Sequence, residues 1–131
     1  MIVWLTGNSG SGKTTLAYSI KDKLPNCIVL DGDDVREYIS KDLGLSKDDR
    51  IENNIRIAHI AKMLHKQGFN IVISSIAPYQ QGRDMVDEVI DCKWVYISGG
   101  RTGDEYPYEI PRDNVLSYEG LINEIKAITR E

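Results

Sequence analysis

The chain of 131 residues lacks any excess of positive charge, because 16 Lys and Arg stand against 20 Asp and Glu. The resulting formal net charge of −4 gives no support to a groove that binds nucleic acid or to contact with an anionic membrane. No apolar run is long enough to cross a bilayer. We therefore expect neither a nucleic-acid partner nor a membrane partner.

Cysteine is also scarce, with only Cys27 and Cys92 in the chain. The two lie far apart and form no metal-spaced pair, which is typical of small buried residues in a reducing compartment. The amino terminus, MIVWLTG, has no basic region and too short an apolar run for a signal peptide. These features predict a cytoplasmic protein, and the length favours a single domain over residues 1–131.

Short apolar runs alternate with stretches of helical spacing. Strands are predicted at 2–5, 27–30, 69–74 and 94–97, with a further short strand near 114–116. Helices are predicted from 16 to Pro25, from a capping box of Ser46 and Asp49 to Gly68, around 85–90, and after Ser117. Residues 98–113 are predicted to be a loop. The alternation predicts an α/β fold with a parallel sheet covered on both faces.

The stretch GNSGSGKT, from Gly7 to Thr14, fits the pattern G-x-x-x-x-G-K-[ST] completely and lies between a predicted strand and a predicted helix. Its glycines let backbone N–H groups turn toward phosphate oxygens, and the helix adds its positive end. Lys13 is expected to reach the β- and γ-phosphates, and Thr14 to help hold Mg²⁺. The residues expected to bind ATP are Gly7, Asn8, Ser9, Gly10, Ser11, Gly12, Lys13, Thr14 and Thr15.

A second candidate group follows the second predicted strand in LDGDDVR. Strand ends of this kind face the ligand crevice of an open parallel sheet. Asp33 is therefore a candidate to accept a proton from an attacking hydroxyl or to orient Mg²⁺ through water, and Asp31 is a candidate structural carboxylate. The alternative is an ordinary DG turn with solvated acids. The short chain has no N-K-x-D guanine signature, which favours a small kinase over a GTPase.

Arg36, Arg50 and Asn53 form a third candidate group. Arg50 and Asn53 are three residues apart at the start of the long predicted helix, so they share a face near its positive end. An arginine can hold a phosphate or sulfate through two parallel hydrogen bonds. The alternative is a solvated helix start with surface charges.

The stretches LTGNSGSGKTTLA, LDGDDVR, SKDLGLSKDDRIENNIRIAHIAK and ISSIAPYQQGRD resemble the adenylyl-sulfate kinase family. Members of this family move the γ-phosphate of ATP to the 3′-hydroxyl of adenylyl sulfate. The resemblance covers about residues 1–97 and a later fragment, PYEIPRDNVL. It implies a P-loop kinase fold, a three-layer α/β/α sandwich with five parallel strands. Relatives are often dimers, so a homodimer is kept as an expectation.

The resemblance also implies roles for individual residues. Arg36, Arg50 and Asn53 would contact the acceptor, with Asp33 as the base. The residues that would line the acceptor's nucleotide pocket are Ile76, Pro78 and Tyr79. An aromatic ring at Tyr79 can stack on a base, although a core-facing tyrosine after a strand is an equal alternative.

This chain departs from the family pattern at several places. Ala77 stands where relatives often carry Ser, so no phosphoserine can form there and direct in-line transfer is the remaining route. The family usually has Phe where this chain has Leu45, and Arg at or near the position of Gln80. The segment after Ile97 is short, whereas relatives carry a basic, mobile lid there. Only Arg101 and Arg112 remain nearby to supply positive charge, and both are equally typical of exposed loops.

Three functions therefore stay open at this stage. The first is transfer of the γ-phosphate of Mg-ATP to the 3′-hydroxyl of adenylyl sulfate, a step of sulfate activation. The second is the same chemistry on another hydroxylated nucleotide or small alcohol, because the trimmed loop alters the acceptor side. The third is a nucleotide-binding module without turnover. Intact Lys13, Thr14 and Asp33 favour the first two.

Overall fold

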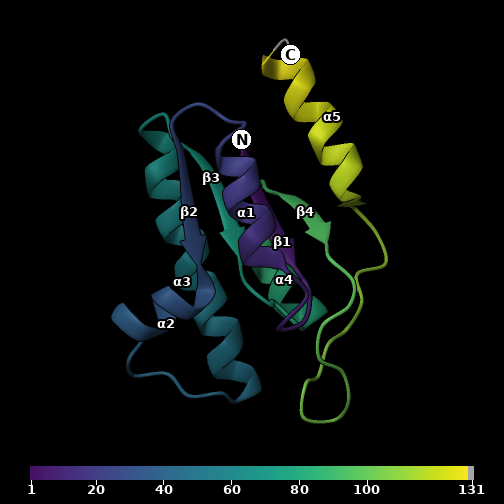
Figure 1. The fold of residues 1–131 in the computed structure, drawn as a ribbon. Coiled ribbons are helices and arrows are strands. Elements are labelled where there is room, and N and C mark those ends of the chain that lie inside the picture. Colours follow the sequence, from purple (N-terminus) through teal and green to yellow (C-terminus); the bar gives the residue numbers. More distant parts are fainter. Residues whose placement is uncertain (130–131) are drawn as a thin grey trace.

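The structure is a computed structural model that describes residues 1–129. Its strands are β1 (Ile2–Thr6), β2 (Cys27–Asp31), β3 (Asn70–Ser74), β4 (Lys93–Tyr96) and β5 (Val115–Leu116). Its helices are α1 (Lys13–Lys21), α2 (Gly32–Tyr38), α3 (Lys47–Lys66), α4 (Gln80–Asp87) and α5 (Tyr118–Thr129). All four strand pairs are parallel, in the order β2-β3-β1-β4-β5 (Figure 1). The predicted α/β fold with a five-stranded parallel sheet is confirmed.

Alternate residues of β1 belong to two apolar clusters, one on each face of the sheet. Val3 and Leu5 pack with Ala17 and Ile20 of α1 and with Leu121 and Ile125 of α5. On the opposite face, Ile2 and Trp4 pack with buried residues of α3 and α4. Both strand faces are buried because helices cover both, which is why β1 appears in the sequence as a continuous apolar run.

Helix α2 is not predicted from the sequence, because the residues DGDD are expected to end the second strand in a turn. The carboxylate of Asp31 instead caps the helix, with Oδ1 accepting the backbone N–H of Asp33 at 2.8 Å. Two acidic residues in the first turn, Asp33 and Asp34, further suit the positive end of the helix. The same residues that suggested a turn therefore start a helix.

Two other helix starts also test the sequence patterns. Oγ of Ser46 accepts the backbone N–H of Asp49 at 3.2 Å, so the predicted cap of α3 is confirmed. The carboxylate of Asp49 does not close the reciprocal half of a capping box but accepts the N–H of Gly44 at 2.7 Å. Helix α4 begins at Gln80, five residues before the predicted start at 85. The residue before it, Tyr79, has an extended backbone and is the N-cap of the helix.

The carboxyl ends of the parallel strands meet at one edge of the sheet. Figure 1 shows the loop before α1, the helix α2 and the long segment between β4 and β5 at that end of the molecule. Within the described residues, this long segment contains turns but no helix or strand. No helix among residues 1–129 is long and apolar enough to cross a membrane.

Candidate active site

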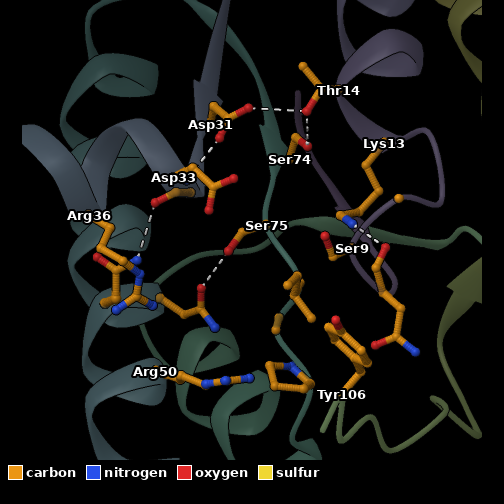
Figure 2. A pocket seen from close by; sticks show the side chains of 18 of the residues that line it. Ser9, Lys13, Thr14, Asp31, Asp33, Arg36, Arg50, Ser74, Ser75 and Tyr106 are labelled. Carbon is orange, nitrogen blue, oxygen red and sulfur yellow. Dashed lines mark hydrogen bonds between the residues drawn. The ribbon is translucent and has the colours of Figure 1, made fainter. Parts of the chain in front are cut away.

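A cavity of about 480 Å³ opens at the carboxyl edge of the sheet. Figure 2 shows Lys13 and Ser9 on one side of it, and Asp33, Arg36 and Arg50 on the other. The cavity thus joins the two groups of candidate residues that the sequence placed far apart. Its walls come from the segment after β1, the start of α2, the start of α3, the segment after β3, and residues 105–107.

The phosphate loop between β1 and α1 is shaped by close backbone contacts. Gly7 has φ 151°, and a Cβ there would collide with the carbonyl oxygen of Ile97. Lys13 is 8% exposed, and its ammonium donates to the carbonyl oxygen of Asn8 at 2.8 Å. Burial lowers the pKa of Lys13, and the carboxylates of Asp33 and Asp31 oppose this shift. Lys13 is thus positioned as a cation at the floor of the loop.

Oxygen atoms gather around Thr14. Its Oγ1 donates to Oδ2 of Asp31 at 3.1 Å and lies 3.3 Å from Oγ of Ser74. Carboxylate and hydroxyl oxygens are ligands that Mg²⁺ prefers. The donor set therefore fits Mg²⁺. The sequence predicts Thr14 and Asp33 as the metal contacts and Asp31 as a structural carboxylate, whereas in the structure Asp31 is the carboxylate that contacts Thr14.

The two arginines of the acceptor group are anchored to one loop. Nη1 of Arg36 donates to the carbonyl oxygen of Gly44 at 2.6 Å, and Nε of Arg50 donates to that of Leu45 at 2.8 Å. Within the described residues these are the hydrogen bonds of the two guanidinium groups, so each of the five-donor groups keeps N–H groups for a ligand. Both residues line the cavity together with Asp33.

Two asparagines on the buried face of α3 also line the cavity. Nδ2 of Asn53 lies 3.4 Å from the carbonyl oxygen of Gly32, and its buried Oδ1 has no partner among the described residues. Asn54 accepts a hydrogen bond from Oγ of Ser75 at 2.8 Å. A buried carbonyl without a partner is costly, so Oδ1 of Asn53 is suited to accept a hydrogen bond from a bound molecule.

The segment after β3 contributes Ile76 and Pro78 to the cavity wall. Tyr79 does not line the cavity: it precedes α4, and Nζ of Lys47 lies 5.1 Å from the centre of its ring. Ala77, which lies between Ile76 and Pro78, has φ 45°, a left-handed conformation that is uncommon for a residue other than glycine. The carbonyl oxygen of Ile76 accepts from Oγ1 of Thr6 at 2.5 Å, which ties this wall to the end of β1.

Arg83 does not line the cavity, so it is not placed to contact an anion bound there. It is 2% exposed and donates from Nη1 to the carbonyl oxygen of Ala77 at 2.6 Å. Its Nη2 donates to the carbonyl oxygen of Glu109 at 2.5 Å. Burial lowers the pKa of Arg83, and Tyr108 and Glu109 oppose the shift. The arginine joins the segment after β3 to the segment before β5.

The sequence patterns missed the residues that the segment 97–114 brings to the site. Glu105, Tyr106 and Pro107 line the cavity, while the exposed Arg101 and Arg112 do not. The backbone N–H of Arg101 donates to the carbonyl oxygen of Ser9 at 2.9 Å. The fragment PYEIPRDNVL matched the family pattern, and its position directly after Tyr106 was the one available signal.

The chain has the P-loop nucleotide-binding fold of the α/β class, because a glycine-rich loop links a strand to a helix and places a buried lysine and a hydroxyl beside a strand-end carboxylate. The family model described as adenylylsulphate kinase matches residues 1–99. The chain therefore belongs to the adenylyl-sulfate kinase family.

Individual relatives agree with this assignment. An adenylyl-sulfate kinase of Bacillus velezensis is 45% identical over 93 residues, which are 68% of this chain and 47% of the relative. Adenylyl-sulfate kinase 3 of Arabidopsis thaliana is 43% identical over 93 residues, 68% of this chain and 45% of the relative. This chain thus spans about half the length of the curated relatives it matches.

Solved structures are similar over a longer stretch. The Mycobacterium tuberculosis APS kinase CysC, in complex with AMPPNP and APS, has a TM-score of 0.83 at 27% identity. That alignment covers 99% of this chain and 97% of the other. A hexameric APS kinase from Thiobacillus denitrificans has a TM-score of 0.75 at 29% identity, over 98% of this chain and 28% of the other.

Proposed function

We propose that this protein transfers the γ-phosphate of Mg-ATP to the 3′-hydroxyl of adenylyl sulfate. The observation that carries the proposal is the shared cavity, which holds Lys13 and Thr14 on one wall and Asp33, Arg36 and Arg50 on the other. A donor phosphate at Lys13 and an acceptor anion at the arginines would face each other across it. Membership of the adenylyl-sulfate kinase family supports this choice of acceptor.

Each wall has its own part in the reaction. The amides of the phosphate loop and Lys13 would bind the phosphates of ATP, and Thr14, Asp31 and Ser74 offer oxygen atoms to Mg²⁺. When bound, Mg²⁺ would neutralise charge on the phosphate oxygens. Thr15 and Ser11, which do not line the cavity, would act through the backbone of the loop.

On the acceptor side, Arg36 and Arg50 would hold the sulfate–phosphate end through their remaining N–H groups. Oδ1 of Asn53 would accept a hydrogen bond from the acceptor. Asp33 would accept the proton of the 3′-hydroxyl as that oxygen attacks the phosphorus. Because Ala77 has no hydroxyl, the phosphoryl group would pass directly to the acceptor. Tyr79, outside the cavity wall, would support Pro78 and the start of α4.

Release of ADP from Mg-ATP, measured with adenylyl sulfate and separately with other hydroxylated nucleotides, tests the proposal. Acceleration by adenylyl sulfate alone supports it. Acceleration by a different acceptor favours the same chemistry on another alcohol, and ATP binding without any acceleration favours a nucleotide-binding module. The segment between β4 and β5 forms no helix or strand within the described residues. A lid excludes water from phosphoryl transfer, so a short segment at this place favours transfer to another alcohol as the alternative function.

Two neighbouring carboxylates give a matched test of the base. Asp33→Asn is expected to lower kcat by about two to four powers of ten while ATP affinity stays unchanged. Asp34→Asn is the control, because Asp34 lies in the same turn of α2, is exposed and does not line the cavity. Equal kcat values for the two variants would remove Asp33 as the base.

We further propose that the chain is cytoplasmic and forms a homodimer. The scarcity of cysteine supports the location, and the hexameric relative supports self-association in this family. Light scattering during size-exclusion chromatography measures the mass directly. A mass of a single 14.8 kDa chain at micromolar concentration would contradict the dimer.

A further inference from the structure

Tyr106 lines the cavity from a segment that is fixed at both of its ends. At the amino-terminal end, Gly100 packs on the phosphate loop so closely that a Cβ would lie 2.6 Å from the carbonyl oxygen of Ser9. The next residue, Arg101, donates its backbone N–H to that same oxygen. These two contacts hold the amino-terminal end of the segment against the phosphate loop.

The carboxyl-terminal end of the segment is fixed to the acceptor wall. The backbone N–H of Glu109 donates to the carbonyl oxygen of Pro78 at 2.7 Å, and Oε1 of Glu109 accepts the N–H of Gln80 at 2.9 Å. The hydroxyl of Tyr108 lies 2.7 Å from Oγ1 of Thr6. Tyr106 thus lies three residues before Glu109, which is anchored on the acceptor wall, and two residues before Tyr108, which is anchored at the end of β1.

The ring of Tyr106 lies beside a cation. The guanidinium carbon of Arg101 lies 5.8 Å from the centre of the ring, within reach of a cation–π contact. Tyr106 lines the cavity, whereas Arg101 does not. A turn braces it further, because its backbone N–H donates to the carbonyl oxygen of Gly103 at 2.9 Å. Figure 2 shows the side chain reaching into the space between Ser9 and Arg50.

We propose that Tyr106 is a specificity-determining residue whose ring makes an aromatic contact with the base of the acceptor nucleotide. The assignment rests on the proposed function, because it takes the acceptor to be a nucleotide. In the proposed function the donor phosphates would lie on the Lys13 side of the cavity, whereas Glu109 anchors the segment of Tyr106 to Pro78 and Gln80 on the acceptor side. Every base has a flat aromatic face, and stacking on a fixed ring costs little ordering of the protein.

Binding of adenylyl sulfate in the presence of Mg-ADP, measured by calorimetry, tests this contact. Tyr106→Ala and Tyr106→Leu are expected to weaken acceptor binding about five- to one-hundred-fold, the range for loss of one base–aromatic stack. Tyr106→Phe keeps the ring and is expected to stay within about twofold of the unmodified protein. ATP affinity is expected to be unchanged in all three. Tyr18→Ala is the matched control, since Tyr18 is a half-exposed tyrosine of α1 outside the cavity.

The outcomes separate this inference from the proposed function. Unmodified protein that fails to bind adenylyl sulfate overturns both. Normal binding by the unmodified protein together with equal binding by Tyr106→Ala overturns the role of Tyr106 alone. Loss of binding in Tyr106→Phe equal to that in Tyr106→Ala also overturns the ring contact. Thermal unfolding of Tyr106→Leu at the temperature of the unmodified protein confirms that the loss of affinity is local.

Discussion

The hydroxyl of Tyr108 lies 2.7 Å from Oγ1 of Thr6, although 102 residues separate them in the chain. Thr6 ends the central strand β1 directly before the phosphate loop. Tyr108 belongs to the long segment before β5, where its ring stacks on Tyr96 with centroids 5.6 Å apart and lies 5.5 Å from the guanidinium of Arg83. The pair joins the long segment between β4 and β5 to the strand that carries the phosphate loop.

Loss of this hydrogen bond is expected to destabilise the protein. Tyr108→Phe keeps the ring and its stacking but removes one hydrogen bond of Oγ1, which still donates to Ile76, so we expect a loss of about 0.5–1.5 kcal/mol in the free energy of unfolding. Urea denaturation at neutral pH measures it. Tyr96→Phe is the control, because the hydroxyl of Tyr96 makes no hydrogen bond within residues 1–129. Equal stability of the two variants would show that the Thr6 contact contributes nothing.

Tyr108 is also expected to lose its proton at a higher pH than an ordinary tyrosine. Burial raises the pKa of Tyr108 to about 12, and the bond from Thr6 and the charge of Arg83 oppose the shift only in part. The chain has 7 tyrosines, and an absorbance titration at alkaline pH counts those that ionise. One tyrosine is expected to ionise near pH 12 in the unmodified protein, and this late step should be missing in Tyr108→Phe.

The raised pKa also sets a direction for stability. A folded-state pKa above the ordinary value of 10 means that the unfolded chain releases this proton first. The contribution of Tyr108 is then complete below pH 10 and is lost as the pH rises through 12. The gap in unfolding free energy between the unmodified protein and Tyr108→Phe should therefore narrow between pH 10 and pH 12. A constant gap would contradict the buried state of the hydroxyl.

Local patterns in the sequence were sufficient to predict the parallel sheet and the phosphate loop, because both depend on periodicity and on spacing within a few residues. The helix α3 with its cap at Ser46 was predictable for the same reason. Helix α2 was not, since the Asp–Gly pair at residues 31–32 favours a turn and a helix cap alike. In the structure Val35 packs in the core, a contact between distant segments that favours the helix.

The cavity was predictable in part. Arg36, Arg50 and Asn53 line it as expected, because strand ends and helix starts meet at one edge of a parallel sheet. The positions of Tyr106 and Arg83 were not predictable, since the segment of Tyr106 is held by a contact of Tyr108 with Thr6, 102 residues away, and Arg83 reaches Glu109, 26 residues away. Spacing rules describe neighbours on one element and carry no information about such contacts.

Asp31 has two separable tasks, and two substitutions distinguish them. It caps α2 through Oδ1 and accepts from Thr14 through Oδ2. Asp31→Asn keeps a good capping oxygen, so we expect stability within about 0.5 kcal/mol of the unmodified protein but a higher Mg²⁺ requirement for turnover. Asp31→Ala should in addition lose about 0.5–2 kcal/mol of stability with the cap. Urea denaturation and a Mg²⁺ titration of ADP release measure the two effects. An unchanged Mg²⁺ requirement in both variants would assign Asp31 to the cap alone.

Gly100 is expected to control the phosphate loop through its lack of a side chain. Gly100→Ala would place a Cβ 2.6 Å from the carbonyl oxygen of Ser9 and 2.9 Å from the backbone nitrogen of Ser11, so the loop must shift. Displacement of about 1 Å at a site of reaction can cost about two powers of ten in rate, and we expect kcat/KM for ATP to fall by that order.

Gly103→Ala is the matched control for this prediction. Both glycines have positive φ, 79° at Gly100 and 107° at Gly103, so both substitutions carry backbone strain of about 1–2 kcal/mol. A Cβ at Gly103 would meet nothing within 4 Å, so its effect should be limited to that strain. Steady-state kinetics with ATP as the varied substrate, together with urea denaturation, separates the two contributions. Equal loss of kcat/KM in both variants would mean that strain in the segment, and not contact with the phosphate loop, sets the rate.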